Sequence, residues 1–485
     1  MDRYATGLAI RAGALGIVAM LAAGCMVGPD YERPSAPTSP AFKESEGWKT
    51  AQPRDGAPRG GWWEVFGDAD LDALVTQVDV TNQTVLAAAA QVREARAAIQ
   101  AARAGLFPTV SGNASALRSA RATRTVGPSG TVGQGITNSY NVALDVSWEI
   151  DLWGGVRRGI EASTATAQAS DADLAAAKLS LQSLLAQDYL LLRVQDAQID
   201  LLRETGANYE RSLQLTRNQY AAGIVARGDV AQAETQLKST QAQLLEAGIV
   251  RAQLEHAIAV LVGKPPAELT IAPKNLAIVF PQIPLTVPSE LLERRPDIAS
   301  AERKVAAANA QIGVAQAAFF PSLSLGATGG FQSSAIGSLF SLPSRFWSLG
   351  PALAQTIFDA GLRAAQKEEA VAAWEATVAN YRQTVLTAFQ EVEDNLTALS
   401  ILEQESGVQD DAVKAARESA AIANNQYRAG TANYLAVIVL QAAALNNERT
   451  ALDIKGRRLT ASVGLIKALG GGWNASSLSA AAPKG

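Results

Sequence analysis

The chain has 485 residues, a formal charge of −4 and 1 cysteine. Its length allows roughly two to four ordinary domains. The charge balance, with no block of basic residues, gives no reason to expect a nucleic-acid partner. His256 is the only histidine, so metal sites of the Cys/His type and the common catalytic triads have too few parts. We therefore expect no enzyme active site and no metal.

The amino terminus has the pattern of a secretory signal peptide. Arginines precede an apolar run over residues 12–23, which is too short to span a bilayer as a helix. The run ends in Leu-Ala-Ala-Gly-Cys, which resembles a bacterial lipobox, although Ala22 stands where a larger aliphatic residue is usual. We predict a lipoprotein signal peptide at residues 1–24 and lipidation at Cys25. The alternative is an unmodified thiol within a signal peptide.

A proline-rich stretch follows the cysteine, and it predicts an extended tail over residues 25–61. Trp62 and Trp63 open the folded part. Alanine and leucine at helical spacing then predict a helix over residues 68–104. This helix should stop before Pro108, because proline disfavours helical backbone in the residue that precedes it.

The chain contains an internal duplication. Two six-residue motifs recur once each: residues 106–111 return as 319–324, and residues 218–223 return as 425–430. The separations of 213 and 207 residues are too long for a solenoid unit and indicate a duplicated domain. We predict a first half at residues 62–272, a second half at 285–473, and a carboxy-terminal tail at 474–485.

Four segments alternate apolar and polar residues with the period of a β-strand. They lie around residues 109–116, 141–150, 322–331 and 347–357, and Pro351 interrupts the last one. Apolar-out, polar-in strands of about ten residues are typical of membrane barrels. The edge of a soluble sandwich shows the same alternation, so the strands alone leave both interpretations open.

Two long stretches without proline predict very long helices, over residues 156–220 and 361–427. Each would measure about 100 Å at about 1.5 Å per residue. Glycines mark the turn after each long helix and the end of the helix that returns from it: Gly223, Gly263, Gly430 and Gly470. Helices of this length favour membrane strands over a soluble sandwich. Four strands are too few to close a barrel, so we expect an oligomer.

The whole pattern, from residue 25 to residue 473, resembles the TolC/OprM-like outer-membrane factors, of the NodT/OprM outer membrane efflux lipoprotein type. The most specific stretch is Arg-Arg-Pro-Asp-Ile at residues 294–298, and Val-Gly-Pro-Asp-Tyr at 27–31 supports it. A capped helix start with no transport role also explains the first stretch. Pro296 suits the first helical turn, and the two preceding arginines could pair with carboxylates of a neighbouring element.

The resemblance implies an α+β fold in which a homotrimer forms a twelve-stranded β-barrel in the outer membrane, continued by a twelve-helix periplasmic α-barrel. It implies passive conduction of drugs or other small molecules. These would arrive through a periplasmic adaptor, a membrane fusion protein, from an inner-membrane efflux transporter expected to be of the resistance-nodulation-division type. The remaining partner is outer-membrane lipid, and no cofactor is expected beyond the covalent lipid on Cys25.

The resemblance also implies a gate at the periplasmic tip, where each long helix meets its returning helix. The corresponding residues here flank the two turns: Asp229, Tyr427, Arg428, Asn433 and Leu435. Relatives commonly carry an acidic residue four positions after that leucine, where this chain has Val439. We therefore expect an apolar constriction formed by Leu435 and Val439. The alternative is that Val439 simply packs within a helix bundle.

Two other classes of protein share part of this pattern. A coiled-coil scaffold would use the long helices but would leave the alternating strands and the lipobox unexplained. A diffusion porin has many strands per chain and no helices of this length.

Overall fold

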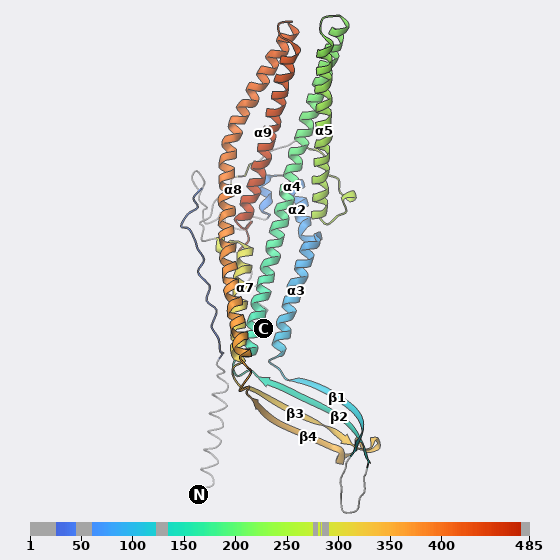
Figure 1. Cartoon of the computed structure of the whole chain (residues 1–485), viewed down its shortest axis with the longest axis vertical. Coiled ribbons are helices and arrows are strands. Elements are labelled where there is room, and N and C mark those ends of the chain that lie inside the picture. Colours follow the sequence, from blue (N-terminus) through green and yellow to red (C-terminus); the bar gives the residue numbers. More distant parts are fainter. Residues whose placement is uncertain are drawn as a thin grey trace, which may run out of the picture. The chain divides into compact units, whose positions relative to one another are not determined.

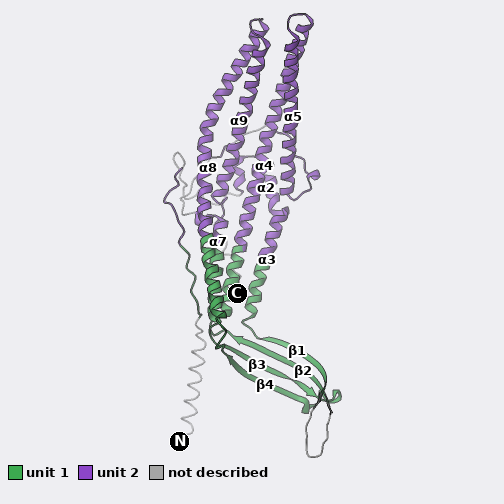
Figure 2. Ribbon diagram, in the orientation of Figure 1, with its two compact units in different colours: residues 1–34, 93–169, 302–380 green, residues 35–92, 170–301, 381–485 purple. Residues whose placement is uncertain are grey.

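The computed structural model describes residues 26–44, 61–122, 134–274, 280–281, 283 and 291–476. The predicted lipidation residue Cys25 and the predicted signal peptide lie outside the described residues. The chain forms two compact units (Figure 2). Residues 1–34, 93–169 and 302–380 make up unit 1, and residues 35–92, 170–301 and 381–485 make up unit 2.

Unit 1 contains a four-stranded antiparallel sheet whose strands lie in chain order (Figure 1). The strands are β1 (Thr109–Ala122), β2 (Gln134–Ile150), β3 (Ser322–Ser333) and β4 (Arg345–Ala354). Pro351 lies in β4, an edge strand, which is where proline is tolerated within a sheet. The fourth strand ends earlier than predicted, so Ile357 lies beyond it.

The two faces of the sheet differ as the alternation predicts. On one face the Asp145 carboxylate accepts hydrogen bonds from Asn113 and from the Thr328 hydroxyl, the latter at 2.7 Å. On the other face large apolar side chains are exposed: Val110, Leu144, Trp347, Leu349 and Leu353. Nothing in the described part of the chain covers these side chains, so this face has the character of an interaction surface.

The long helices extend as the sequence predicts. Helices α4 (Gly155–Ala221) and α8 (Leu362–Arg428) each contain 67 residues. The returning helices α5 (Arg227–Leu261) and α9 (Tyr434–Ala468) each contain 35. Among the described residues, no helix has an apolar stretch long enough to cross a membrane.

The predicted helix over residues 68–104 is in fact two helices, α2 (Ala69–Thr81) and α3 (Gln83–Ala104). They separate at Asn82, whose backbone is extended. The Asn82 side chain accepts hydrogen bonds from the backbone N–H groups of Thr84 and Val85, so it starts α3 as an N-cap. The same side chain donates to the carbonyl oxygen of Leu261 at 2.8 Å. This second bond attaches the end of α5 to the start of α3.

The second half closes in the same way. The short α6 (Leu291–Arg294) precedes α7 (Pro296–Ala317), and Arg295 occupies the position of Asn82. Its guanidinium donates to the carbonyl oxygen of Ala468, the last residue of α9, at 3.2 Å. Arg295 pairs at 2.7 Å with Glu391 of the neighbouring α8, as predicted, and at 2.7 Å with Asp297, two residues along the chain. Pro296 starts its helix as predicted.

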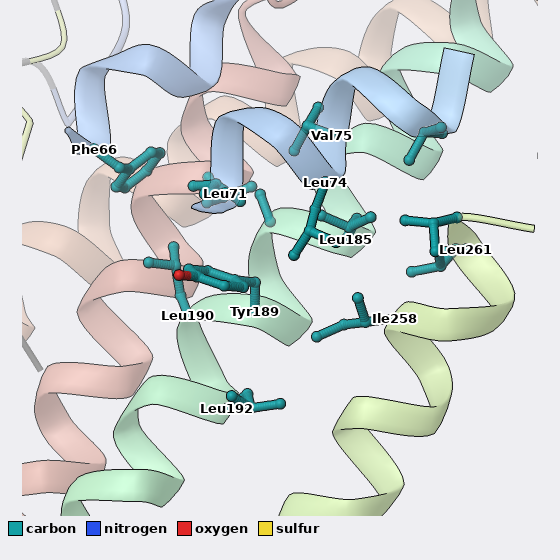
Figure 3. Close-up of a cluster of buried hydrophobic side chains, with 14 of the residues drawn as sticks. Phe66, Leu71, Leu74, Val75, Leu185, Tyr189, Leu190, Leu192, Ile258 and Leu261 are labelled. Carbon is teal, nitrogen blue, oxygen red and sulfur yellow. The ribbon is translucent and has the colours of Figure 1, made fainter. Parts of the chain in front are cut away.

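A hydrophobic core in unit 2 holds the first half together (Figure 3). Leu71 and Val75 of α2 pack with Leu185 and Tyr189 of α4 and with Ile258 of α5. The Tyr189 hydroxyl donates to the Asp68 carboxylate at 2.9 Å. Along α4, Leu185 and Leu192 are buried in this part of the structure, whereas Leu184 is exposed.

A buried ion network ties α4 to α5. Asp196 accepts hydrogen bonds from Arg193 at 3.0 Å and from Arg251 at 2.6 Å. Arg251 also donates to Glu255 at 2.7 Å. Removing the shared carboxylate would leave two guanidinium groups close together in a buried site.

We predict that Asp196→Ala lowers the free energy of unfolding by about 3–5 kcal/mol, the cost of breaking a buried ion pair. Asp200→Ala is the matched control one turn further along α4, because Asp200 pairs with the exposed Arg203 and should contribute less than about 1 kcal/mol. Denaturant unfolding followed by circular dichroism measures both. Equal losses of unfolding free energy for the two variants would contradict a stabilising role for the buried ion network.

Candidate channel tip and amino-terminal anchor

The two helical tips have the same backbone (Figure 1). After α4, Gly223 has φ of +74° and the Ile224 N–H donates to the Gln219 carbonyl at 2.9 Å. After α8, Gly430 has φ of +73° and the Thr431 N–H donates to the Gln426 carbonyl at 2.9 Å. A residue with a Cβ would be strained at either glycine. The duplication therefore extends to the hydrogen bonds of the turns.

Two hydrogen bonds join α8 and α9 to α4 at this level. The Tyr427 hydroxyl donates to Gln219 Oε1 at 2.6 Å. The Tyr434 hydroxyl shares a hydrogen bond of 3.2 Å with the Ser212 hydroxyl. The rings of Tyr427 and Tyr434 pack with their centroids 5.2 Å apart. We call these four residues the Tyr427 seam.

Burial favours the neutral form of the Tyr427 hydroxyl. The Tyr427 side chain is only 8% exposed, and this burial raises the pKa of its hydroxyl above the ordinary value. The hydroxyl therefore stays protonated near neutral pH and remains a donor to Gln219. Buried apolar residues continue the contact below the hydroxyl groups: Tyr209, Leu213, Val230, Leu237 and Val437.

Two of the predicted gate residues cap helices. The Asp229 carboxylate accepts a hydrogen bond from the Ala226 N–H at 3.2 Å, which closes the start of α5. Asn433 accepts from the Ala436 N–H at 3.0 Å and starts α9. Asn433 is the N-cap residue of α9, whereas Asp229 is the third residue of α5 and bonds back to the N-cap residue, as in a capping box. These contacts give each residue a structural role at its turn.

The other predicted gate residues lie apart from one another. Tyr427 is in the seam, whereas Arg428 lines a cleft of about 360 Å³ bounded by α4, α8 and α9. Leu435 and Val439 are 51% and 57% exposed and lie one turn apart on α9. Neither of these two packs closely within the described chain, so both are available to a neighbour or to a pore.

Sequence reasoning missed three of the four seam residues: Gln219, Tyr434 and Ser212. Gln219 lies in the duplicated Asn-Gln-Tyr motif, so its repeat was visible in the sequence, but its partner was not. The hydrogen bond joins residues 208 positions apart. Helical periodicity carries no information about such a pairing.

Residues 27–31, the Val-Gly-Pro-Asp-Tyr motif, are held within unit 1 by Arg158. The Arg158 side chain is 1% exposed. It donates to the carbonyl oxygens of Val27 and Gly28 at 3.2 and 3.1 Å, and to Asp30 at 2.8 Å. Gly28 has φ of +96°, and a Cβ there would overlap the backbone of Gly313. The motif thus forms a sequence-specific anchor for the amino-terminal tail.

Further contacts extend this anchor. The Val27 N–H donates to the Trp153 carbonyl at 3.1 Å, just after β2 ends. The Tyr31 hydroxyl hydrogen-bonds Glu302, and Arg303 lies over the Tyr31 ring at 5.6 Å. Met26, the residue after Cys25, lies against Gly154. The start of the described tail is therefore fixed beside the end of a strand.

Comparison with known proteins identifies the family. A sequence model of the outer membrane efflux protein family matches residues 74–264 and 287–471. The probable efflux pump outer membrane protein TtgC of Pseudomonas putida is 34% identical over 462 residues, which cover 95% of each chain. The cation efflux system protein CusC of Escherichia coli is 30% identical over 459 residues, covering 94% of this chain and 97% of that one.

Solved structures agree with this result. The outer-membrane channel OprN matches with a TM-score of 0.86 and 31% identity, over 93% of this chain and 100% of that chain. The open state of the MtrE outer-membrane channel of Neisseria gonorrhoeae matches with a TM-score of 0.80 and 28% identity, over 93% and 99%. The chain belongs to the outer membrane efflux protein family, and it is an outer-membrane channel component of an efflux pump.

Proposed function

We propose that three copies of this chain form one pore that passively conducts small molecules across the outer membrane. The observation that carries this proposal is the four-stranded sheet with two open edges, β1 and β4, and one exposed apolar face. An unpaired edge strand is a template for pairing with another chain. Bacterial barrels have at least about eight strands. Three chains that each contribute four strands would close a twelve-stranded barrel.

Exposed apolar stripes on the helices support the same assembly. On α8, Ile401, Val408 and Ile422 are exposed at multiples of seven residues. On α5, Leu245 and Ile249 are exposed one turn apart. Apolar residues at heptad spacing form seams with other helices. We propose that these stripes pack between neighbouring chains and continue the pore as a twelve-helix α-barrel.

The proposed membrane attachment is a covalent lipid on Cys25, with no other cofactor. The Arg158 contacts support it, because they hold the residues just after the cysteine beside the end of β2. A lipid attached there would enter the membrane close to the strands. One acyl chain alone gives marginal membrane binding, whereas several chains or an additional membrane contact give stable attachment.

We propose that the channel works with a periplasmic adaptor and an inner-membrane transporter, of the resistance-nodulation-division type. The energy and most of the selectivity would then reside in the transporter. The names of relatives support a permissive channel, since they mention toluene, pyoverdine and cations. Within the proposed pore, Leu435 and Val439 form an apolar constriction and the Tyr427 seam holds the tip closed.

The proposed function predicts a pore of uniform size. The purified full-length protein, reconstituted in a planar lipid bilayer, should give discrete conductance steps. A coiled-coil scaffold of the same helices would give none. Absence of conductance from protein that is demonstrably folded and trimeric would contradict the proposal.

An apolar constriction predicts that gate conductance is insensitive to pH where carboxylates titrate. In an Asp229→Asn background, single-channel conductance should change little between pH 7 and about pH 3, which lies below the ordinary pKa of aspartate. Val439→Asp should add a charged, hydrated ring at pH 7 and raise cation conductance. That gain should disappear as the pH falls below about 4, because the ring becomes neutral.

Val80→Asp is the matched control for the last variant, since Val80 is also exposed but lies on α2, outside the proposed stripes and the tip. It should not create the same pH dependence of conductance. Strong pH dependence in the Asp229→Asn protein itself would refute the apolar constriction.

The Tyr427 seam predicts a cost for opening. Tyr427→Phe removes one hydrogen bond from each of the three proposed chains, each worth about 0.5–1.5 kcal/mol, and should raise the open probability in single-channel records by at least about 2-fold. Tyr381→Phe is the control, because the buried Tyr381 hydroxyl on the same helix has no hydrogen-bond partner among the described residues. Equal effects of the two substitutions would argue against the proposal that the Tyr427 seam holds the tip closed.

A further inference from the structure

The Tyr427 seam joins the second half of the chain to the first half. Each of its two main residues has an equivalent in the other half, because both tips follow the same offset of 207 residues. Tyr427 corresponds to Tyr220, and Gln219 corresponds to Gln426. The repeat therefore suggests an equivalent hydrogen bond, in which Tyr220 would donate to Gln426 as Tyr427 donates to Gln219.

This second version is not made within one chain. Tyr220 is 44% exposed, whereas Tyr427 is 8% exposed. In the described part of the chain, neither the Tyr220 hydroxyl nor the Gln426 side chain has a hydrogen-bond partner. The backbone around both residues matches that of the satisfied pair, since the turn hydrogen bonds agree within about 0.1 Å. The difference therefore lies in the missing neighbour rather than in the local fold.

We propose that the Tyr220 hydroxyl of one chain donates a hydrogen bond to the Gln426 side chain of a second copy of this chain. The inference rests on the proposed trimer, in which first and second halves alternate around a ring. Each second half would then have two first-half neighbours, one from its own chain and one from the next. The contact within the chain is the Tyr427 seam, and the contact to the next chain is the inter-subunit seam of Tyr220 and Gln426.

The surface fits this partner in geometry as well as in chemistry. Tyr427 and Gln219 project toward each other from two coil pairs, α8 with α9 and α4 with α5. Because the two helix pairs are equivalent, Tyr220 lies on the face of its pair that corresponds to the face on which Tyr427 lies. Gln426 lies on the opposite face of its own helix pair, as Gln219 does on its pair. A ring of such pairs brings Tyr220 to Gln426 at each subunit boundary.

The inter-subunit seam is chemically weaker than the Tyr427 seam. The residue that corresponds to Tyr434 is Arg227, which is exposed and has no partner among the described residues. The aromatic pair and the second hydrogen bond, from Tyr434 to Ser212, therefore have no full equivalent between subunits. Opening of the tip should begin at the subunit boundaries.

Chemical cross-linking tests this contact. One chain carries Tyr220→Cys and a second, differently tagged chain carries Gln426→Cys, and the two are co-expressed at full length. A short bifunctional thiol reagent should link them as a heterodimer that contains both tags. The intra-chain pair Gln219→Cys with Tyr427→Cys is the matched control, because it has the same spacing and should link within one chain without forming dimers.

The controls separate this inference from the proposed function. Oligomeric state is measured independently by native mass spectrometry of the same preparations. Trimers in which the control pair links but the Tyr220→Cys and Gln426→Cys chains do not would overturn the inter-subunit seam and leave the trimer intact. Monomers only would overturn the trimer as well. Each chain with only one introduced cysteine, expressed alone, should give no linked dimer.

Discussion

In both halves of the chain, the last carbonyl of the returning helix accepts a hydrogen bond from a side chain at the start of a shorter helix. Asn82 makes this bond to Leu261, and Arg295 makes it to Ala468. The glycine that follows each carbonyl by two residues packs so closely on the neighbouring backbone that a Cβ would overlap it. These closures fix where α5 and α9 end. Because α4 and α8 also have equal lengths, the two tips fall into matching positions and Tyr427 can meet Gln219.

The duplication thus gives the two tips the same backbone, but their side chains differ. The first turn is followed by Asp229, a carboxylate that caps its helix, whereas the equivalent position in the second half is Ala436. The second tip carries Tyr434, Leu435 and Val439, and it is the more apolar of the two. In a proposed ring of three chains, the backbone at the tip would therefore have nearly sixfold symmetry, whereas the side chains would have only threefold symmetry. Contacts within a chain and contacts between chains need not break together.

Much of the fold could be predicted because its signals are local. The ends of the long helices follow from Gly223 and Gly430, because glycine adopts the left-handed backbone of the turns without strain. Strands follow from alternation, and the sheet confirms it. The failures have one physical cause. The break at Asn82 depends on a bond to a residue 179 positions away. The partners of Tyr427 and Arg158 lie 208 and 131 positions away. Periodicity describes which face of a helix is apolar, but it cannot identify the side chain across the contact.

We propose that the hydrogen bond between Tyr427 and Gln219, which joins the two halves, holds the tip closed. Locking this contact tests it most directly. A chain with Gln219→Cys and Tyr427→Cys, bridged by a reducible thiol reagent, should conduct little in a planar bilayer, and reduction of the bridge should restore the conductance of the unlinked channel. Full conductance while the bridge is intact, as verified by mass spectrometry, would show that this contact does not hold the tip closed.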